Sequence, residues 1–186
     1  PIPAFVDKPV YFHGDPRLHE RPVSELFSAM LQLGIRYAAE SDRLPVRVYP
    51  GPVRGGTIRL PDLPSSQVVT SLMMAALWME EDLEIVFEGM VPSAPYFEMT
   101  LKLMKRLGIH AVRNENRIFV KAQKPSYDWN VTVEKDMSAS AYWVVLALIN
   151  GMEITLPNMT LPSLQGDEKI FEIAEDCGGE VSLVRE

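Results

Sequence analysis

The alternation of apolar and polar positions along the chain predicts short strands interleaved with helices. The most continuous apolar stretch covers residues 67–79, in which only Gln67, Thr70 and Ser71 are polar. Apolar residues cover every face of this stretch, and Leu, Met and Ala favour helix, so it predicts a helix buried inside a domain. The polar turn Pro64-Ser65-Ser66-Gln67 opens the helix, which places two hydroxyls and an amide at its N-terminus.

Shorter runs, bounded by glycine, proline and acidic turns, predict the remaining elements. A second nearly all-apolar helix is expected over 139–149, opened by Asp136-Met137-Ser138, and it too should be buried. Three amphipathic helices are expected, beginning at Pro22 and near Pro95 and Gln165, and ending at Gly34, Gly108 and Gly178. Strands are expected at 10–13, 36–39, 46–49, 57–60, 83–87, 111–113, 118–121, 131–133, 154–156 and 181–184.

These elements recur with a period that indicates an internal repeat. The glycines that end the amphipathic helices are 74 and then 70 residues apart, and the buried helices open 72 residues apart, near Ser66 and Ser138. Each unit reads strand, buried helix, strand, amphipathic helix, strand, strand, which places the fold in the α/β or α+β class. The first and last units lack elements beyond Pro1 and Glu186, so we expect the chain to be cut from a longer protein.

Composition narrows the functional classes. The chain has 186 residues, 47% of them hydrophobic, and a net charge of -7, which argues against a general nucleic-acid binder. The single cysteine, Cys177, excludes an intrachain disulfide, and the three scattered histidines offer no metal-ligand spacing. The N-terminal residues lack a signal-peptide pattern, and no segment predicts a membrane span. We therefore expect a cytoplasmic protein with neither nucleic acid nor membrane as partner.

Ser65 and Ser66 have two interpretations. Serines before a helix are most often caps that accept a hydrogen bond from a backbone N–H, and on this stretch alone that interpretation is favoured. The free N–H groups and positive dipole end of a buried helix also make a good phosphate site, which added hydroxyls would strengthen. Evidence from the rest of the chain is needed to choose between these two roles.

Five motifs in order supply that evidence. They are Gly14-Asp-Pro-Arg-Leu-His-Glu-Arg-Pro22, Ser65-Ser66-Gln67, Ser93-Ala94-Pro95-Tyr96 followed by Met99-Thr100-Leu101, Glu134-Lys135-Asp136-Met137-Ser138, and Leu164-Gln165-Gly166-Asp167. Through these motifs the chain resembles the 5-enolpyruvylshikimate-3-phosphate synthase family of enolpyruvyl transferases over nearly its whole length.

The resemblance implies a fold of two domains, each of three βαβαββ units with buried central helices and outer sheets. It also implies that residues 1–133 form the last two units of the first domain, the first of them incomplete, and that 134–186 begin the second domain.

The resemblance also implies a reaction in the shikimate pathway of aromatic amino acid biosynthesis. The enolpyruvyl group of phosphoenolpyruvate moves to the 5-hydroxyl of shikimate 3-phosphate, through a tetrahedral intermediate, and inorganic phosphate leaves. No metal or organic cofactor takes part. The chemistry therefore requires anion binding together with well-placed acids and bases.

The family's binding roles map onto particular residues. Ser65 and Ser66 resemble the serines that hold the 3-phosphate, and Ser93 resembles a third donor, although a plain helix cap is its alternative interpretation. Gln67 resembles the amide that contacts both substrates, since an amide can donate and accept. Arg17 resembles the arginine that binds phosphoenolpyruvate through a planar guanidinium.

Three further residues have lesser roles by the same resemblance. Tyr96 is a possible pocket wall, with a core position as the alternative. Asp136 and Ser138 are expected to shape the hinge and to cap the second apolar helix. The family usually has a basic residue at the position of Ala94, which is a departure.

The catalytic acids and bases of the family have no counterpart in this sequence, so we assign no catalytic residue and expect no turnover by the chain alone. The remainder of the enzyme would then be an obligatory partner.

One alternative is the related transferase that acts on UDP-N-acetylglucosamine, which uses a reactive loop cysteine. Cys177, at a predicted helix end, is poorly placed for that role. The other alternative is a non-catalytic α/β binding module.

Overall fold

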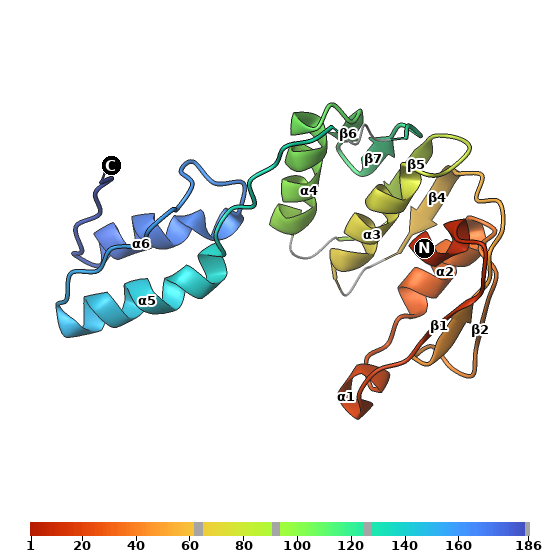
Figure 1. The fold of residues 1–186 in the computed structure, drawn as a ribbon, viewed down its shortest axis with the longest axis horizontal. Coiled ribbons are helices and arrows are strands. Elements are labelled where there is room, and N and C mark those ends of the chain that lie inside the picture. The colour runs from red at the N-terminus through yellow and green to blue at the C-terminus, as the bar shows by residue number, and fades with distance from the viewer. Residues whose placement is uncertain (62–64, 91–93, 125–127, 185–186) are drawn as a thin grey trace. The chain divides into compact units, whose positions relative to one another are not determined.

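A computed structural model describes residues 1–61, 65–90, 94–124 and 128–184. The chain divides into two compact units, Pro1–Tyr127 and Asp128–Glu186 (Figure 1). The division falls six residues before the boundary expected at 133/134, and the assignment of the two units to the two domains of the family stays a prediction.

The first unit opens with a three-stranded antiparallel sheet. Its strands β1 (Val10–Phe12), β2 (Tyr37–Ala39) and β3 (Val46–Val48) lie in the order β1-β3-β2. The 3₁₀ helix η1 (Ile2–Phe5) precedes β1, and helices α1 (Pro16–His19) and α2 (Ser24–Gln32) connect β1 to β2. The helix expected from Pro22 thus begins at Ser24, and the basic segment expected as a loop contains one helical turn.

A four-stranded sheet follows in the same unit. Strands β4 (Gly56–Leu60), β5 (Leu83–Phe87), β6 (Ala111–Asn114) and β7 (Arg117–Val120) lie in the order β4-β5-β7-β6. β4 and β5 are parallel, and helix α3 (Gln67–Ala76) is the crossover between them, while α4 (Ala94–Arg106) connects β5 to β6. The antiparallel order β5-β7-β6 matches β1-β3-β2 of the first sheet.

Helix α3 lies in the core of this unit, as its sequence predicts. Val69, Leu72 and Met73 are 0% exposed, and the helix packs against α4 and β5. Among the apolar side chains of the helix and of the residues just after it, Met74 and Trp78 are the exposed ones, at 41% and 40%. Removing this much apolar surface from water is the main stabilising contribution to the unit, and it fixes the direction in which the N-terminus of α3 points.

The second unit contains α5 (Met137–Asn150), η2 (Gly166–Lys169) and α6 (Ile170–Asp176), with η2 and α6 packed on α5. The expectation that α5 is buried is wrong for this chain. One stripe, Met137, Val144 and Ala147, is buried, whereas Tyr142 is 81% and Ile149 77% exposed. An apolar helix is buried only as far as other elements cover it, and among the described residues of this unit only η2 and α6 do so.

The three strands expected in the second unit are also wrong. Residues 131–133, 154–156 and 181–184 lie within the described part of the chain, and none of them is assigned to a strand there. A strand exists only where its backbone N–H and C=O groups pair with a neighbouring strand. The sequence pattern identifies segments suited to pairing, but it does not supply the partner.

Candidate anion-binding site

The N-terminus of α3 brings together three of the predicted site residues. The Gln67 backbone N–H donates to the Ser65 hydroxyl at 3.2 Å, whereas Ser66, the N-cap residue of α3, makes no side-chain cap hydrogen bond. The first bond of the helical ladder runs from the Thr70 N–H to the Ser66 carbonyl at 3.1 Å. The N–H groups of Val68 and Val69 have no acceptor among the described residues, so this turn presents unpaired donors at the positive end of the helix dipole.

Ser66 differs from its neighbours in burial. It is 3% exposed and is the one buried polar residue of the described ranges, whereas Gln67 is exposed and Ser65 half-buried. No hydrogen bond between described residues involves its hydroxyl. The Ser66 hydroxyl is therefore available to donate a hydrogen bond to a ligand.

The beginning of α4 lies beside the beginning of α3. The Thr100 hydroxyl donates to the Tyr96 carbonyl at 3.2 Å, and the Thr70 and Thr100 hydroxyl oxygens are 3.4 Å apart, so Thr70 can donate to Thr100. The N-terminal halves of the two helices therefore meet on the same side of the unit (Figure 1). Tyr96, on the first turn of α4, is 52% exposed, and Ser93 lies outside the described residues.

Arg17 lies on a different turn. It is an exposed residue of α1, whose N-cap Asp15 accepts the Leu18 N–H at 2.9 Å. Among the described residues, no contact joins Arg17 to the turn formed by residues 65–67, and α1 projects from the chain before α2 (Figure 1). The predicted 3-phosphate residues Ser65 and Ser66 thus lie together with Gln67, whereas Arg17 lies on another segment, in α1.

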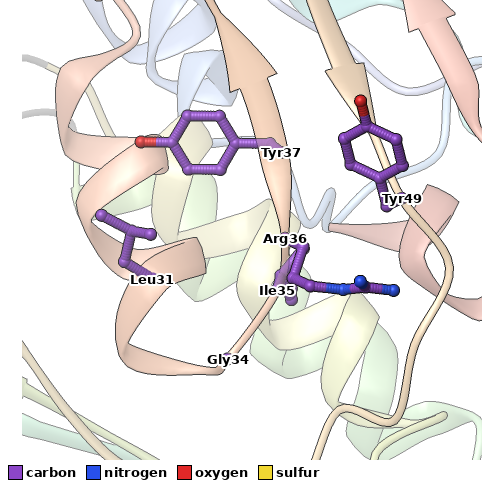
Figure 2. A pocket seen from close by; sticks show the side chains of 6 residues that line it. All are labelled: Leu31, Gly34, Ile35, Arg36, Tyr37 and Tyr49. Atoms are coloured by element: carbon purple, nitrogen blue, oxygen red, sulfur yellow. The ribbon is translucent and has the colours of Figure 1, made fainter.

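Two surface hollows of the first unit lie away from these residues. Figure 2 shows the first, of about 490 Å³, between the end of α2 and the start of β2. Its lining includes the guanidinium of Arg36, which donates to the Pro50 carbonyl at 3.1 Å, and the rings of Tyr37 and Tyr49. The second, of about 540 Å³, lies between η1 and residues 50–53. Neither hollow contains a predicted site residue, and both are wide open, so the candidate site is defined by converging donors and not by a cavity.

Two motifs of the second unit, separated by almost thirty residues, also meet. Asp136 caps α5 by accepting the Ala139 N–H at 3.0 Å, as predicted, and the Ser138 hydroxyl donates to the Asp167 carboxylate. Gln165 accepts the Met137 N–H at 3.0 Å. Each motif can be recognised separately in the sequence, but the pairing of Ser138 with Asp167 has no local sequence signal, because it depends on how η2 packs on α5.

The described residues contain neither a candidate membrane span nor a candidate metal site. No helix there is both long and apolar enough to cross a membrane. No three His, Cys, Asp or Glu side chains within those ranges gather closely enough to hold a metal ion.

Comparison with known proteins identifies the family of the chain. The family model described as EPSP synthase (3-phosphoshikimate 1-carboxyvinyltransferase) matches residues 1–185. The chain belongs to the EPSP synthase family. The resemblance carried by the five motifs is thereby confirmed, and so is the mixed α/β fold class.

Relatives within the EPSP synthase family are longer than this chain. A 3-phosphoshikimate 1-carboxyvinyltransferase of Marinomonas sp. is 32% identical over 174 residues, which cover 91% of this chain and 41% of the relative. The chloroplastic enzyme of Brassica napus is 39% identical over 175 residues, covering 91% and 34%. An EPSP synthase structure from Acinetobacter baumannii aligns with a TM-score of 0.73 at 21% identity, covering 95% of this chain and 39% of that one, which shows a shared fold.

Proposed function

We propose that the N-terminus of α3 binds the 3-phosphate of shikimate 3-phosphate, and that the chain contributes this site to a 3-phosphoshikimate 1-carboxyvinyltransferase. The observation that carries the proposal is the turn at residues 65–69. It combines two hydroxyls, an exposed amide and two backbone N–H groups without described acceptors at the positive end of a helix. A fully ionised phosphate can only accept hydrogen bonds. The hydroxyl, amide and backbone N–H donors of this turn therefore match its oxygens.

Ser66 gives this proposal its specific support. Ser66 is 3% exposed, and no hydrogen bond of its hydroxyl is found among the described residues, so this hydroxyl is available to donate to a phosphate oxygen. The exposed Gln67 amide can both donate and accept, which suits a residue between two substrates. Ser93 keeps its role as a third phosphate donor by family resemblance alone.

Arg17 is our proposed contact to phosphoenolpyruvate. Its side chain is exposed, and no ion pair or hydrogen bond of its guanidinium is found in the described ranges. A guanidinium fork binds carboxylate or phosphate in two parallel hydrogen bonds. Tyr96, half-exposed on the neighbouring helix α4, is a candidate wall of the same pocket.

The reaction would transfer the enolpyruvyl group from phosphoenolpyruvate to the 5-hydroxyl of shikimate 3-phosphate, in aromatic amino acid biosynthesis. The chain spans 34–41% of the length of the relatives it matches. We propose that the remaining part of the family's length supplies the general acids and bases, and that this chain alone does not turn over. The matching strand orders of the two sheets in the first unit support an internal repeat. The cytoplasmic setting stays a prediction, since chloroplastic relatives share the match.

Cys177 argues against the UDP-amino sugar alternative. It is an exposed free cysteine directly after the last residue of α6. Nucleophilic thiolates are favoured at helix N-termini or beside cations, whereas a helix C-terminus carries the opposite partial charge. The position therefore lacks the feature that a reactive cysteine needs.

Titration of shikimate 3-phosphate into the 186-residue chain, followed by calorimetry and by backbone amide NMR shifts, tests the proposal. We expect binding that requires the 3-phosphate, with the largest shifts at Gln67, Val68 and Val69, and no such shifts with shikimate. Ser66→Ala should remove the response, whereas Ser28→Ala, an exposed serine on α2, should keep it. Equal responses to shikimate and its phosphate would overturn the proposal, and preferential binding of UDP-N-acetylglucosamine would favour the alternative transferase. A response unchanged in Ser66→Ala would favour the non-catalytic module.

A further inference from the structure

The first sheet has one buried and one exposed face. Successive residues of a strand point to opposite faces, so the register of the sheet assigns each side chain to one face. On β3, Val46 and Val48 are buried, whereas Arg47 between them is exposed. The residues paired with Arg47 are Tyr11 of β1 and Ala38 of β2, and both are exposed as well. The exposed face therefore presents a row of side chains that crosses the whole sheet.

A second row lies beside the first. The Tyr49 N–H donates to the Arg36 carbonyl at 2.9 Å, so the pairing of β2 with β3 continues one residue beyond these strands. Arg36 and Tyr49 lie two residues from Ala38 and Arg47 respectively, and therefore on the same face. Figure 2 shows the Arg36 side chain extending towards the strand of Tyr49, whereas Tyr37 extends the opposite way. We call Tyr11, Arg36, Ala38, Arg47 and Tyr49 the outer face of the first sheet.

Both arginines of the outer face keep donors for a ligand. The Arg47 guanidinium lies over the Tyr11 ring, with 5.8 Å between its carbon and the ring centroid, and Arg36 donates to the Pro50 carbonyl at 3.1 Å. No ion pair of either guanidinium is found in the described ranges, and Glu40, the exposed acidic residue just after β2, has none there either. A guanidinium has more N–H donors than one carbonyl can accept, so the outer face is positively charged and open to an anionic partner.

The spacing of the two guanidinium groups indicates the kind of partner. Arg36 and Arg47 are diagonal neighbours on adjacent strands, about 7–8 Å apart at the backbone. In an extended segment, residues i and i+2 lie on one side about 7 Å apart, so two carboxylates separated by one residue match the two arginines. Tyrosine and arginine are also enriched in protein interfaces. A nucleic acid strand fits less well, because its affinity rises with the number of phosphates contacted, and two cations on a chain of net charge -7 contact few.

We propose that the outer face binds an extended acidic segment of a partner protein, with two carboxylates separated by one residue. Each carboxylate accepts hydrogen bonds from one guanidinium, Arg36 or Arg47, in the paired geometry that arginine forms with carboxylate. The rings of Tyr11 and Tyr49, diagonal neighbours on β1 and β3, offer apolar surface to the side chain beside the carboxylates. The proposal concerns the first sheet alone and does not depend on the anion site proposed at the N-terminus of α3.

The probe is the pentapeptide acetyl-Val-Glu-Val-Glu-Tyr-amide, titrated to millimolar concentration into the ¹⁵N-labelled 186-residue chain. NMR shifts of the Arg36 and Arg47 Nε–H signals and of the Ala38 amide report binding. The reordered peptide acetyl-Val-Val-Glu-Glu-Tyr-amide carries the same charge but places its carboxylates on opposite sides of an extended chain. We expect saturable shifts with the first peptide and an affinity weaker by about three-fold or more for the second, since only one carboxylate then reaches a guanidinium.

Substitutions locate the binding on the outer face. Arg36→Gln and Arg47→Gln should each weaken the affinity about two- to five-fold, the range of one exposed ion pair, and the double variant should lose the shifts. Arg54→Gln, the same change at an exposed arginine outside the outer face, should leave the affinity unaltered. Glu40→Gln should raise the affinity, because it removes a negative charge near the site.

Several results would overturn the proposal. These are equal affinity for the two peptides, undiminished binding in the double variant, and no shift at millimolar peptide. Tighter binding of a thymidine oligonucleotide than of the acidic peptide would assign the outer face to nucleic acid instead. Shifts that appear when the chain is concentrated without peptide would assign it to a second copy of the chain.

Discussion

Gln32 forms two hydrogen bonds with the backbone of Arg59. Its side-chain amide donates to the Arg59 carbonyl at 2.9 Å and accepts the Arg59 N–H at 2.8 Å. Gln32 is the last residue of α2, the helix that connects β1 to β2 of the first sheet. Arg59 lies in β4, the edge strand of the second sheet. One side chain therefore links the two halves of the first unit and occupies backbone groups of an edge strand that would otherwise be open to pairing.

We predict that Gln32→Ala lowers the free energy of unfolding of the first unit by about 1–2 kcal/mol, because two neutral hydrogen bonds at an exposed site are lost. Urea unfolding followed by tryptophan fluorescence measures this change. Ser28→Ala, also exposed and on α2, is the matched control and should shift the value by less than about 0.5 kcal/mol. A Gln32→Ala value within that same margin would contradict the linking role.

Gly55 is required by a close backbone approach. Its φ is +98°, and a Cβ atom there would lie 2.3 Å from the carbonyl oxygen of Glu81. We predict that Gly55→Ala destabilises the first unit by about 3 kcal/mol, combining the strain of a positive φ with overpacking against backbone. Thermal unfolding checks this, with Gly51→Ala as the control, because nothing lies within 4 Å of a Cβ at Gly51. Equal melting temperatures for the two variants would show that the backbone at Glu81 moves away from residue 55 without a measurable loss of stability.

Glu84 couples three strands of the second sheet on its exposed face. Arg117 of β7 donates to its carboxylate at 3.0 Å, and Thr57 of β4 donates at 3.1 Å. The Arg117 hydrogen bond holds the pKa of Glu84 below its ordinary 4.5. Loss of hydration raises this pKa, and the Thr57 hydrogen bond lowers it further. Both hydrogen bonds act on the ionised form, so the carboxylate favours the folded state only while it is deprotonated.

A pH dependence of stability follows from this lowered pKa. A group whose pKa is lower in the folded state contributes stability above its unfolded pKa, and the contribution is lost as pH falls through the folded pKa. We predict that Glu84→Gln is less stable than the unmodified chain at neutral pH and that the gap closes as pH falls below about 4.5. Denaturant midpoints between pH 3 and 7 measure the gap. Glu81→Gln, whose carboxylate has no ion pair in the described ranges, should show no comparable gap.

Elements whose pattern is complete within their own residues could be predicted from the sequence. Helix α3 is one example, since apolar residues on all its faces already require burial, and the order β4-α3-β5-α4-β6-β7 follows from consecutive runs. The capping role of Asp136 was also local, because its side chain accepts an N–H only three residues further along the chain. The family motifs then added roles that no local pattern carries.

What escaped prediction depends on distant partners. Burial of α5 requires elements that cover it, and the segments 131–133, 154–156 and 181–184 need strands to pair with. The bond between Gly14 and His19 spans a turn that sequence indicates only as a loop. Side-chain links such as Gln32 to Arg59, 27 residues apart, depend on the packing of whole elements and leave no periodic signal.

Gln165 links the two motifs of the second unit, and its loss should open that link selectively. Its amide donates to the Lys135 carbonyl at 2.6 Å and accepts the Met137 N–H at 3.0 Å, which holds the start of α5 against the residues before η2. We predict that Gln165→Ala raises the hydrogen-exchange rate of the Met137 amide about tenfold, since an amide exchanges once its acceptor is removed and the local structure opens. Native-state exchange by NMR measures this rate, and Glu175→Ala, an exposed change on α6, should leave it unaltered. If Met137 stays protected in Gln165→Ala, the Asp136 cap and the packing of α6 hold this helix start without the glutamine.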